Sequence, residues 1–281
     1  MLKLRSNAPN QCVYFLLGEP PIEAKIHCDI YSLFYSLWCN KESKIHSVVK
    51  YLLQNIETKN SNTWSKYVLY LSKLYNTEDP LSCLNRNPPD KETYKAYYKT
   101  KIIKFHESEQ RRNAKNNSCM KYLNVDLLGL SNKIHPIISN ILTTSDMEQA
   151  IPHIKMLCMN YYTYEIKSRQ KGGPDKCPRC GINSYHTDNL QHILTAHISE
   201  AGYNILCEIE QLCEGSKSKI NFKNILRYEE SFCQFILDPT SMNLNKRISI
   251  EDPLLIPIIQ KCRQFCHLID KERKSSLKNL C

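Results

Sequence analysis

Two cysteines separated by two residues and two histidines separated by four stand close together in the segment CPRCGINSYHTDNLQHILTAH. Zinc in structural sites binds four nitrogen or sulfur ligands in a tetrahedron, and paired Cys and His at such spacings are typical of these sites. We predict that Cys177, Cys180, His192 and His197 bind one structural Zn²⁺ ion. Four protein ligands would leave no open position on the ion for catalysis.

The local sequence contains the elements that would bring these ligands together. Gly181 allows the chain to double back after the cysteine pair, and Asp188 is expected to cap a short helix that carries His192. His197 follows five positions later, about 140° further round an ideal helix. Both imidazoles therefore reach one ion only if the last turn of this helix tightens or unwinds.

Alternatives to this ligand set stay open from the residues alone. His186 and Cys207 are reserve ligands. The Cys177–Cys180 pair also has the spacing of a redox-active pair, although no strand–helix pattern of the thioredoxin type surrounds it. Zinc is the stronger interpretation because the two histidines complete a ligand set.

The length and charge of the whole chain limit the number of domains and the kind of partner that can be expected. Its 281 residues are enough for one large or two medium domains with a core of their own. The net charge of +10, from 38 Lys and Arg against 28 Asp and Glu, favours a polyanionic partner such as RNA or DNA. A bias in codon usage, which would also explain the many Asn, Ile and Tyr residues, is the competing interpretation.

The cysteines and the apolar runs indicate the compartment. The 14 cysteines are scattered, and MLKLRSNAPNQ lacks the apolar core of a signal peptide, so free thiols in a reducing environment are expected. We therefore expect a cytoplasmic or nuclear protein that is not secreted. No apolar run approaches the roughly 20 residues of a membrane span, so no membrane partner is expected.

Apolar residues recur with helical spacing along almost the whole chain, and only 7 glycines are available for hairpin turns. The predicted fold is all-α, an irregular helical array with one small zinc-stapled knuckle. We divide it into a helical region over 1–122, a helical connector over 123–170, the knuckle over 171–199 and a C-terminal helical region over 200–281.

Apolar stripes and helix-capping residues predict the positions of particular helices. One apolar stripe is formed by Ile26, Ile30, Leu33, Phe34 and Leu37, and a second, behind a cap at Ser43, is formed by Ile45, Val48, Val49, Leu52, Leu53 and Ile56. Ser145 and Glu148 are expected to form a capping box, and FKNILRYEESFCQFILDP is expected to be one helix. Cys262 and Cys266 share a helix face and are interpreted as core residues.

The most basic helix is expected between Lys91 and Lys115, where eight Lys and Arg face three Glu. Lys91, Lys95 and Lys99 recur every four residues and therefore line one flank. Contact with phosphates and a merely solvated helix face are both consistent with this row. A second basic segment, KSRQKGGPDK, is expected to be flexible. The predicted nucleic-acid contacts are Lys91, Lys95, Lys99, Arg111, Arg112, Lys167, Arg169 and Lys171.

Several segments, in one order along nearly the whole chain, resemble the region C-terminal to the polymerase in LINE-type non-LTR retrotransposon reverse transcriptases. CPRCGINSYHTDNLQHILTAH is similar to the C-x2-C and H-I-L-x-x-C segment of that family. YFLLGEPPIEAKIH resembles its L-L-G-x-x-P-I-E-A stretch, and HIKMLCMNYYTYE resembles its M-L-x-G-x-Y helix. SNTWSKYVLYLSKLYNTEDPLSCL resembles its S-W-x-x-x-V segment followed by Y-x-x-x-x-P-L.

The resemblance implies that the first helices are thumb-like or linker structure beside a polymerase core, which would be a partner. It also implies that the zinc segment helps to grip template RNA or target DNA. His197 stands where the family usually has Cys, and the loop to His192 is a few residues longer.

The family's polymerase needs paired aspartates for two metal ions, and this sequence has no Asp-Asp pair. We therefore expect a non-catalytic fragment or truncated copy. A zinc-stapled helical scaffold with a protein partner is the alternative function. A nuclease, the third class, would need a carboxylate cluster that the sequence does not suggest.

Overall fold

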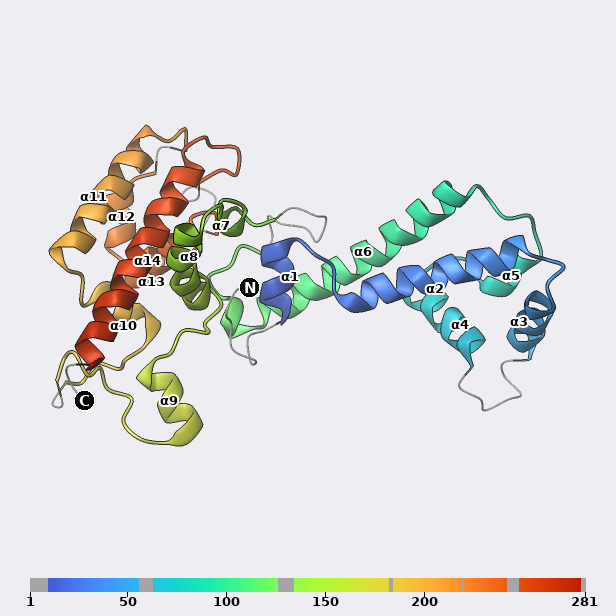
Figure 1. Cartoon of the computed structure of the whole chain (residues 1–281), viewed down its shortest axis with the longest axis horizontal. Helices are drawn as coiled ribbons and strands as arrows, with labels where there is room; N and C mark the ends of the chain where they lie inside the picture. The colour runs from blue at the N-terminus through green and yellow to red at the C-terminus, as the bar shows by residue number, and fades with distance from the viewer. Residues whose placement is uncertain are drawn as a thin grey trace. The chain divides into compact units, whose positions relative to one another are not determined.

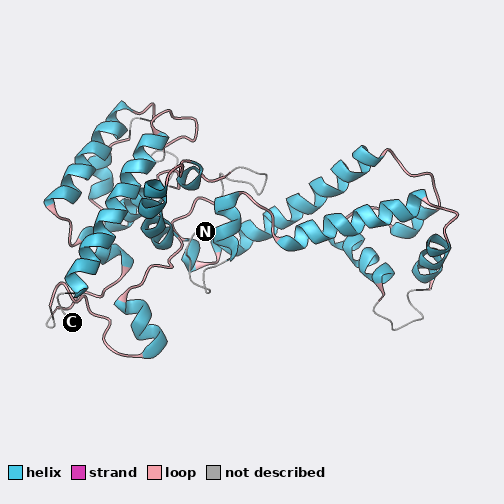
Figure 2. Ribbon diagram, viewed as in Figure 1, coloured by secondary structure: helices cyan, strands magenta, loops and turns pink. Residues whose placement is uncertain are grey.

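The computed structural model of this chain describes residues 10–55, 63–125, 134–181, 184–218, 220–241 and 248–278. Over these ranges the protein is all-α, with 14 α-helices and no strand beyond one isolated antiparallel bridge between Lys176 and Thr187 (Figures 1 and 2). The predicted fold class is confirmed. The chain divides into a host unit, Met1–Gly18 with Asn113–Cys281, and an inserted unit, Glu19–Arg112.

The inserted unit is built from helices with well-defined starts. They are α2 (Ile22–Cys39), α3 (Lys44–Gln54), α4 (Trp64–Leu74), α5 (Pro80–Leu84) and most of α6 (Lys91–Lys115). Ser43 caps α3 as predicted, because its side chain accepts a hydrogen bond from the backbone N–H of Ile45 at 3.2 Å. Asp90 caps α6 in the same way, because its side chain accepts a hydrogen bond from the backbone N–H of Thr93 at 2.9 Å.

The core of the inserted unit is rich in aromatic rings. Tyr31, Phe34 and Trp38 of α2 are buried against α6, where Tyr94 and Tyr98 are buried in turn. The rings of Tyr31 on α2 and Tyr98 on α6 lie with their centroids 4.1 Å apart. Large rings at helical spacing therefore hold these two helices together over several turns.

A chain of hydrogen bonds joins three helices on another side of this core. His27 Nε2 lies 2.8 Å from the hydroxyl of Tyr67, its Nδ1 contacts the hydroxyl of Tyr75, and that hydroxyl lies 2.9 Å from His106 Nε2. Burial lowers the pKa of His27 and of His106, so both rings are neutral near pH 7 and each can be a donor at one nitrogen and an acceptor at the other. Every hydrogen bond of this series can therefore form without a charged group.

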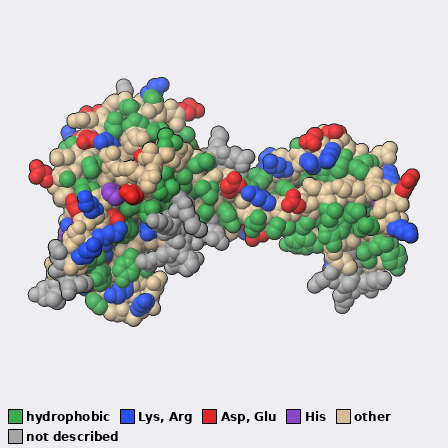
Figure 3. Space-filling model, viewed as in Figure 1, with side chains coloured by type: hydrophobic (Ala, Val, Ile, Leu, Met, Phe, Trp, Pro, Cys, Tyr) green, Lys and Arg blue, Asp and Glu red, His purple; other side chains and the backbone are tan. Residues whose placement is uncertain are grey.

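Two of the predicted apolar stripes are only partly buried, because each contains both core residues and exposed residues. On α2 the helix buries Tyr31 and Phe34, while Ile26 is 49 % and Leu33 is 53 % exposed. On α3 the predicted stripe buries Val49 and Leu53, while its members Ile45 and Val48 are exposed, as is Tyr51. Figure 3 shows hydrophobic side chains gathered over α2, α3 and α4. Each of these helices is apolar on two faces, and periodicity alone did not identify the face that is buried. Ile56, the last member of the predicted stripe on α3, lies outside the described residues.

The host unit is organised around its longest helix, α14 (Leu255–Lys278), which packs against α8 (Thr144–Leu157) and α11 (Glu200–Gly215). The remaining helices are α1 (Asn10–Leu17), α7 (Pro136–Ser139), α9 (Tyr164–Lys171), α10 (Leu190–Thr195), α12 (Phe222–Leu226) and α13 (Glu229–Leu237). Cys262 and Cys266 of α14 are both fully buried among apolar side chains, which confirms that they belong to the core.

A polar cluster is enclosed in this core. His135 Nδ1 accepts from the backbone N–H of Ile137, so its Nε2–H donates to Asp238 Oδ2 at 3.2 Å. Burial by itself would raise the pKa of Asp238, but His135, the hydroxyl of Thr240 and the backbone N–H of Asn124 lower it below its usual value. Asp238 is therefore a structural carboxylate that fastens three chain segments to one another.

Two local predictions in the host unit are wrong. The capping box of α8 is formed by Thr143 and Asp146, because the N-cap lies two residues earlier than Ser145. The predicted helix from Phe222 onwards breaks after Leu226, and α13 restarts after Tyr228. In both places several residues of similar propensity stand next to one another, so the pattern located the element better than its ends.

Candidate metal centre

The four predicted ligands converge on one point. Cys177 Sγ lies 3.3 Å from His197 Nε2, and Cys180 Sγ lies 3.2 Å from the Nε2 atoms of both His192 and His197. All four donor atoms lie within 4.8 Å of one another. Ligand atoms bound to one tetrahedral zinc at its usual bond lengths are roughly 3.3 to 3.8 Å apart. The cluster therefore has the spacing of a site that can bind a single metal ion.

A short hairpin positions the two cysteines. The backbone N–H of Cys177 donates to His186 O at 2.9 Å, and the backbone N–H of Asp188 donates to Asp175 O at 2.8 Å. The backbone N–H groups of Arg179 and Cys180 donate to the sulfur of Cys177. Such bonds favour a thiolate, which is the form of cysteine that binds metal.

The turn that holds the cysteines closes at a glycine. Gly181 has φ +91°, a backbone conformation that residues with a side chain rarely adopt, and open space surrounds the position of a Cβ. The prediction that Gly181 lets the chain turn back after Cys180 is confirmed. A side chain at this position would be strained by the backbone and not by its neighbours.

The place where α10 ends allows both histidines to reach the same point. The helix carries His192 and ends at Thr195, so His197 lies beyond it and its ring is free to turn back toward the cluster. The two imidazole rings meet edge to face with centroids 5.1 Å apart. Termination of the helix thus provides the unwinding that the spacing requires.

Asn189, and not Asp188, caps α10. The side chain of Asn189 accepts from the backbone N–H of His192 at 2.9 Å, so the prediction of Asp188 as the cap is wrong by one residue. Asp188 is fully buried and accepts two hydrogen bonds from Arg273, at 2.7 and 2.6 Å, and one from the backbone N–H of Tyr164 at 2.7 Å. It connects the knuckle to α9 and α14.

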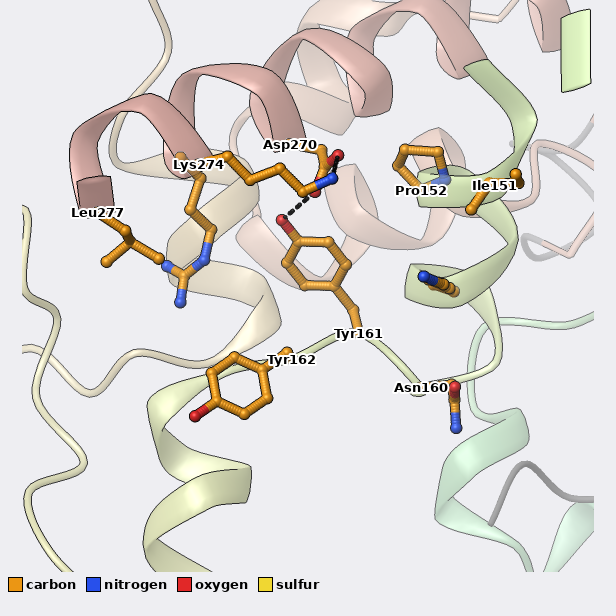
Figure 4. Close-up of a pocket in the computed structure, with 10 residues that line it drawn as sticks. Ile151, Pro152, Asn160, Tyr161, Tyr162, Asp270, Lys274 and Leu277 are labelled. Carbon is orange, nitrogen blue, oxygen red and sulfur yellow. Dashed lines mark hydrogen bonds and ion pairs between the residues drawn. The ribbon is translucent and has the colours of Figure 1, made fainter. Parts of the chain in front are cut away.

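Arg273 also forms part of the wall of a pocket of about 170 Å³ between α8 and α14. Figure 4 shows Tyr161 and Lys274 reaching the same carboxylate, that of Asp270; the distances are 2.9 Å to Oδ1 and 2.6 Å to Oδ2. Burial and the neighbouring Asp270 raise the pKa of Tyr161, which keeps its hydroxyl a neutral donor. These contacts hold the residues that precede α9 against α14.

The protonation states of the cluster suit a cation. Burial lowers the pKa of His192 and of His197, which favours the neutral imidazole that binds metals. Burial also raises the pKa of the Cys177 thiol. A thiolate there needs a positive charge beside it, and a divalent ion between the four donors would supply that charge.

The reserve ligands stay outside the cluster. The ring of His186 stacks on that of His192 with centroids 5.1 Å apart, and its side chain is exposed. Cys207 is exposed on α11. Within the described ranges no other group of three or more His, Cys, Asp or Glu side chains brings its donor atoms this close together.

The predicted lysine row lies along α6. Lys91, Lys95 and Lys99 are all exposed, and Figure 3 shows Lys and Arg side chains along this helix. No carboxylate of the described residues forms an ion pair with any of the three. Lys95 and Lys99 line a pocket of about 180 Å³ together with three tyrosines.

The other predicted contacts are arranged differently. Arg111 and Arg112 each pair with a glutamate of α6 at 2.7 Å, so part of their charge is used within the helix. Lys167, Arg169 and Lys171 are exposed on α9, so the prediction of a flexible segment is wrong up to Lys171. The helix ends where Gly172, with φ +72°, follows.

Arg273 is the residue near the centre that sequence reasoning missed. Its partner Asp188 lies 85 positions away in the sequence, so no short window contains both residues. A polar residue on the apolar side of a helix was the one available signal, since Arg273 shares its face with the buried Ile269 and Cys266.

Comparisons with protein families, with curated proteins and with solved structures find no match to this chain. In the part of the chain that the structure describes, no helix is long and apolar enough to cross a membrane. The metal centre therefore rests on its own geometry.

Proposed function

We propose that this chain is a non-catalytic nucleic-acid-binding protein, with an all-α framework stapled by one structural zinc ion. The observation that carries the proposal is the row formed by Lys91, Lys95 and Lys99, which is exposed on α6 and free of ion pairs with the described carboxylates. Unpaired lysines in a row can replace the counterions of a phosphate backbone.

The surroundings of the row support this role. The three tyrosines that line the hollow beside Lys95 and Lys99 are buried in the core of the inserted unit, whereas Tyr97 of the same helix is 45 % exposed. Proteins that bind single strands combine cations for the phosphates with rings for the bases. The net charge of the whole chain, +10, acts in the same direction.

The zinc ion in this proposal has a structural task. Cys177, Cys180, His192 and His197 would hold it, and two thiolates with two neutral imidazoles make the site neutral overall. Lys176 and Arg179 directly precede the two cysteines in the sequence, and a neutral centre beside them would not repel phosphates. The resemblance to the C-terminal region of non-LTR retrotransposon reverse transcriptases supports the same proposal and suggests template RNA or target DNA as the ligand.

Salt dependence tests the proposal. If the three lysines contact phosphates, log K for a labelled single-stranded oligonucleotide should fall with log salt by about 0.7 to 0.9 per contact. Changing Lys91, Lys95 and Lys99 to Gln should flatten the slope by about 2 to 3 units. The matched control, Lys44, Lys66 and Lys73 to Gln, removes the same charge from other helices and should leave the slope unchanged. Equal slopes in both triple variants would show that the row is only a solvated face.

A protein-interaction scaffold is the second candidate. It is favoured by the exposed apolar side chains of α2 and α3, among them Ile22, Ile26 and Val48, which are 58 %, 49 % and 55 % exposed. Surfaces of this kind often mark sites where proteins associate. If the chain bound no oligonucleotide at any salt concentration, the result would favour the scaffold.

A further inference from the structure

The inserted unit contains a second pocket next to α6, on the opposite flank from Lys95 and Lys99. Its volume is about 270 Å³. Four aromatic rings line it, those of Trp38, Tyr94, Tyr97 and Tyr98, together with Glu78, Arg86, Pro89 and Thr93. This is enough room for one planar ring system.

The wall of this pocket is fixed in advance. The indole N–H of Trp38 donates to Arg86 O at 2.9 Å, and the hydroxyl of Tyr35 donates to Pro89 O at 2.8 Å. Two side chains of α2 thus hold the loop between α5 and α6 in place. Tyr97 stands edge to face against Tyr98, with centroids 5.1 Å apart, and is itself 45 % exposed. A ligand that enters meets a preformed aromatic wall at low entropic cost.

The charges around the pocket decide the class of ligand. The guanidinium of Arg86 lies over the ring of Trp38 at 5.5 Å, and Nζ of Lys101 lies over the ring of Tyr97 at 5.8 Å. Glu78 forms an ion pair with Arg86. The chain's own cations therefore already cover two ring faces and neutralise the one carboxylate, so a cationic ligand would be repelled. A neutral planar ring with a negative group attached fits these charges.

We propose that this pocket receives one nucleobase of a single-stranded nucleic acid, with Tyr97 and Arg86 as the stacking surfaces and Lys101 beside the adjoining phosphate. Every base has a π-face, and both aromatic rings and guanidinium planes stack on it. The inference rests on the proposed function but concerns a different property, the contribution of the bases to affinity.

The experiment compares two labelled strands of equal length, oligothymidylate and its abasic counterpart, on the full chain. Stacking of one base typically changes affinity by roughly 5- to 150-fold. The wild type should prefer the strand with bases by a factor in this range, and Tyr97→Ala should lose the preference while its salt slope stays the same. Tyr97→Phe should keep the preference, because the stacking ring remains.

Tyr70→Ala is the matched control, since Tyr70 is a tyrosine of the same unit that is 53 % exposed and does not line the pocket. A free nucleotide, thymidine monophosphate, provides a further arm; binding that competes with the strand and is weakened by Tyr97→Ala supports the pocket. Equal binding of both strands by the wild type, or loss of the preference in Tyr70→Ala as well, would overturn the pocket and leave the proposed function intact. Absence of binding to either strand would overturn both, and a preference for bases without a salt slope would support the pocket alone.

Discussion

Arg273 donates two hydrogen bonds to Asp188, at 2.7 and 2.6 Å, and both side chains are almost completely buried. The pair joins the C-terminal helix to the residue that stands between the cysteine hairpin and α10. Through Asp188 it also reaches the first backbone N–H of α9. The position of the metal ligands is therefore set partly by a helix that contributes no ligand.

Loss of one partner of this pair should be costly. Arg273→Ala leaves a buried carboxylate without its counter-charge, and we expect a loss of about 3 to 5 kcal/mol in the free energy of unfolding and weaker zinc binding. The double variant Asp188→Asn, Arg273→Met removes both charges and should recover part of this loss. Urea titrations and competition with a zinc chelator would measure the two effects.

The control for the buried pair is the exposed pair of Arg169 with Glu165 on α9. Arg169→Ala should change the free energy of unfolding by less than about 1 kcal/mol. A cost for Arg273→Ala no larger than that of Arg169→Ala would contradict the importance assigned to the buried pair.

The ligand set makes a second prediction. Cys177→Ser and His192→Ala should lose zinc, because each removes one donor from the tetrahedron. His186→Ala should keep zinc, since its ring only stacks on His192. His197→Cys should also keep it, because a thiolate is a zinc ligand too. Metal analysis of the purified variants gives the answer directly.

Circular dichroism of the same variants tests what the metal stabilises. The core around α14 consists mainly of apolar residues outside the knuckle, although Leu190, Ile193 and Leu194 of α10 contribute to it, so most helical signal should survive removal of the ion. Zinc retained in Cys177→Ser, or lost in His186→Ala but not in His197→Ala, would show that the tetrahedron is assigned wrongly.

A third prediction concerns the stability of the fold at low pH. His153 is fully buried, its Nε2 lies 2.8 Å from Leu237 O, and burial lowers its pKa to about 4. The unfolded chain, with a pKa near 6.5, binds the proton more readily, so the contribution of His153 to stability is complete above about pH 6.5 and is lost as pH falls to about 4. The whole effect amounts to roughly 3 kcal/mol.

His153→Gln provides the comparison, because an amide N–H can replace Nε2–H at Leu237 O without titrating. Unfolding by urea at a series of pH values should give a shallower dependence for His153→Gln than for the wild type between about pH 6.5 and 4. Parallel curves for the two proteins would show that His153 is not neutral in the folded state.

The fold class and the four ligands could be predicted because both depend on local patterns. Cys177 and Cys180 are near neighbours in sequence, and so are His192 and His197, so short segments suffice to position each pair. The buried faces of α2 and α3 could not be chosen in the same way, since apolar residues such as Ile26 occur on two sides of these helices. The buried face of α2 lies against the aromatic residues of α6, which are far away in sequence, and α3 packs against α4 and α5.

The precise roles of polar residues were also beyond local reasoning. Asp188 and Asn189 are adjacent, and either has a side chain that can cap a helix. Arg273 decides between them, because it occupies the carboxylate of Asp188 and leaves Asn189 to cap α10. A contact over such a distance in sequence has no signature in a window of a few residues.

The insertion of Glu19–Arg112 into the host unit has a consequence for synthesis on the ribosome. Cys12, Phe15 and Leu16 of α1 belong to the same core as residues that follow Asn113, and the backbone N–H of His135 donates to Leu16 O. At typical translation rates α1 therefore waits roughly 5 to 20 s for its partners while the inserted unit emerges complete. The later part of the chain then folds back onto its own beginning, so a nascent chain stalled just after the whole inserted unit has left the ribosome would display a finished inserted unit and an unpaired first helix.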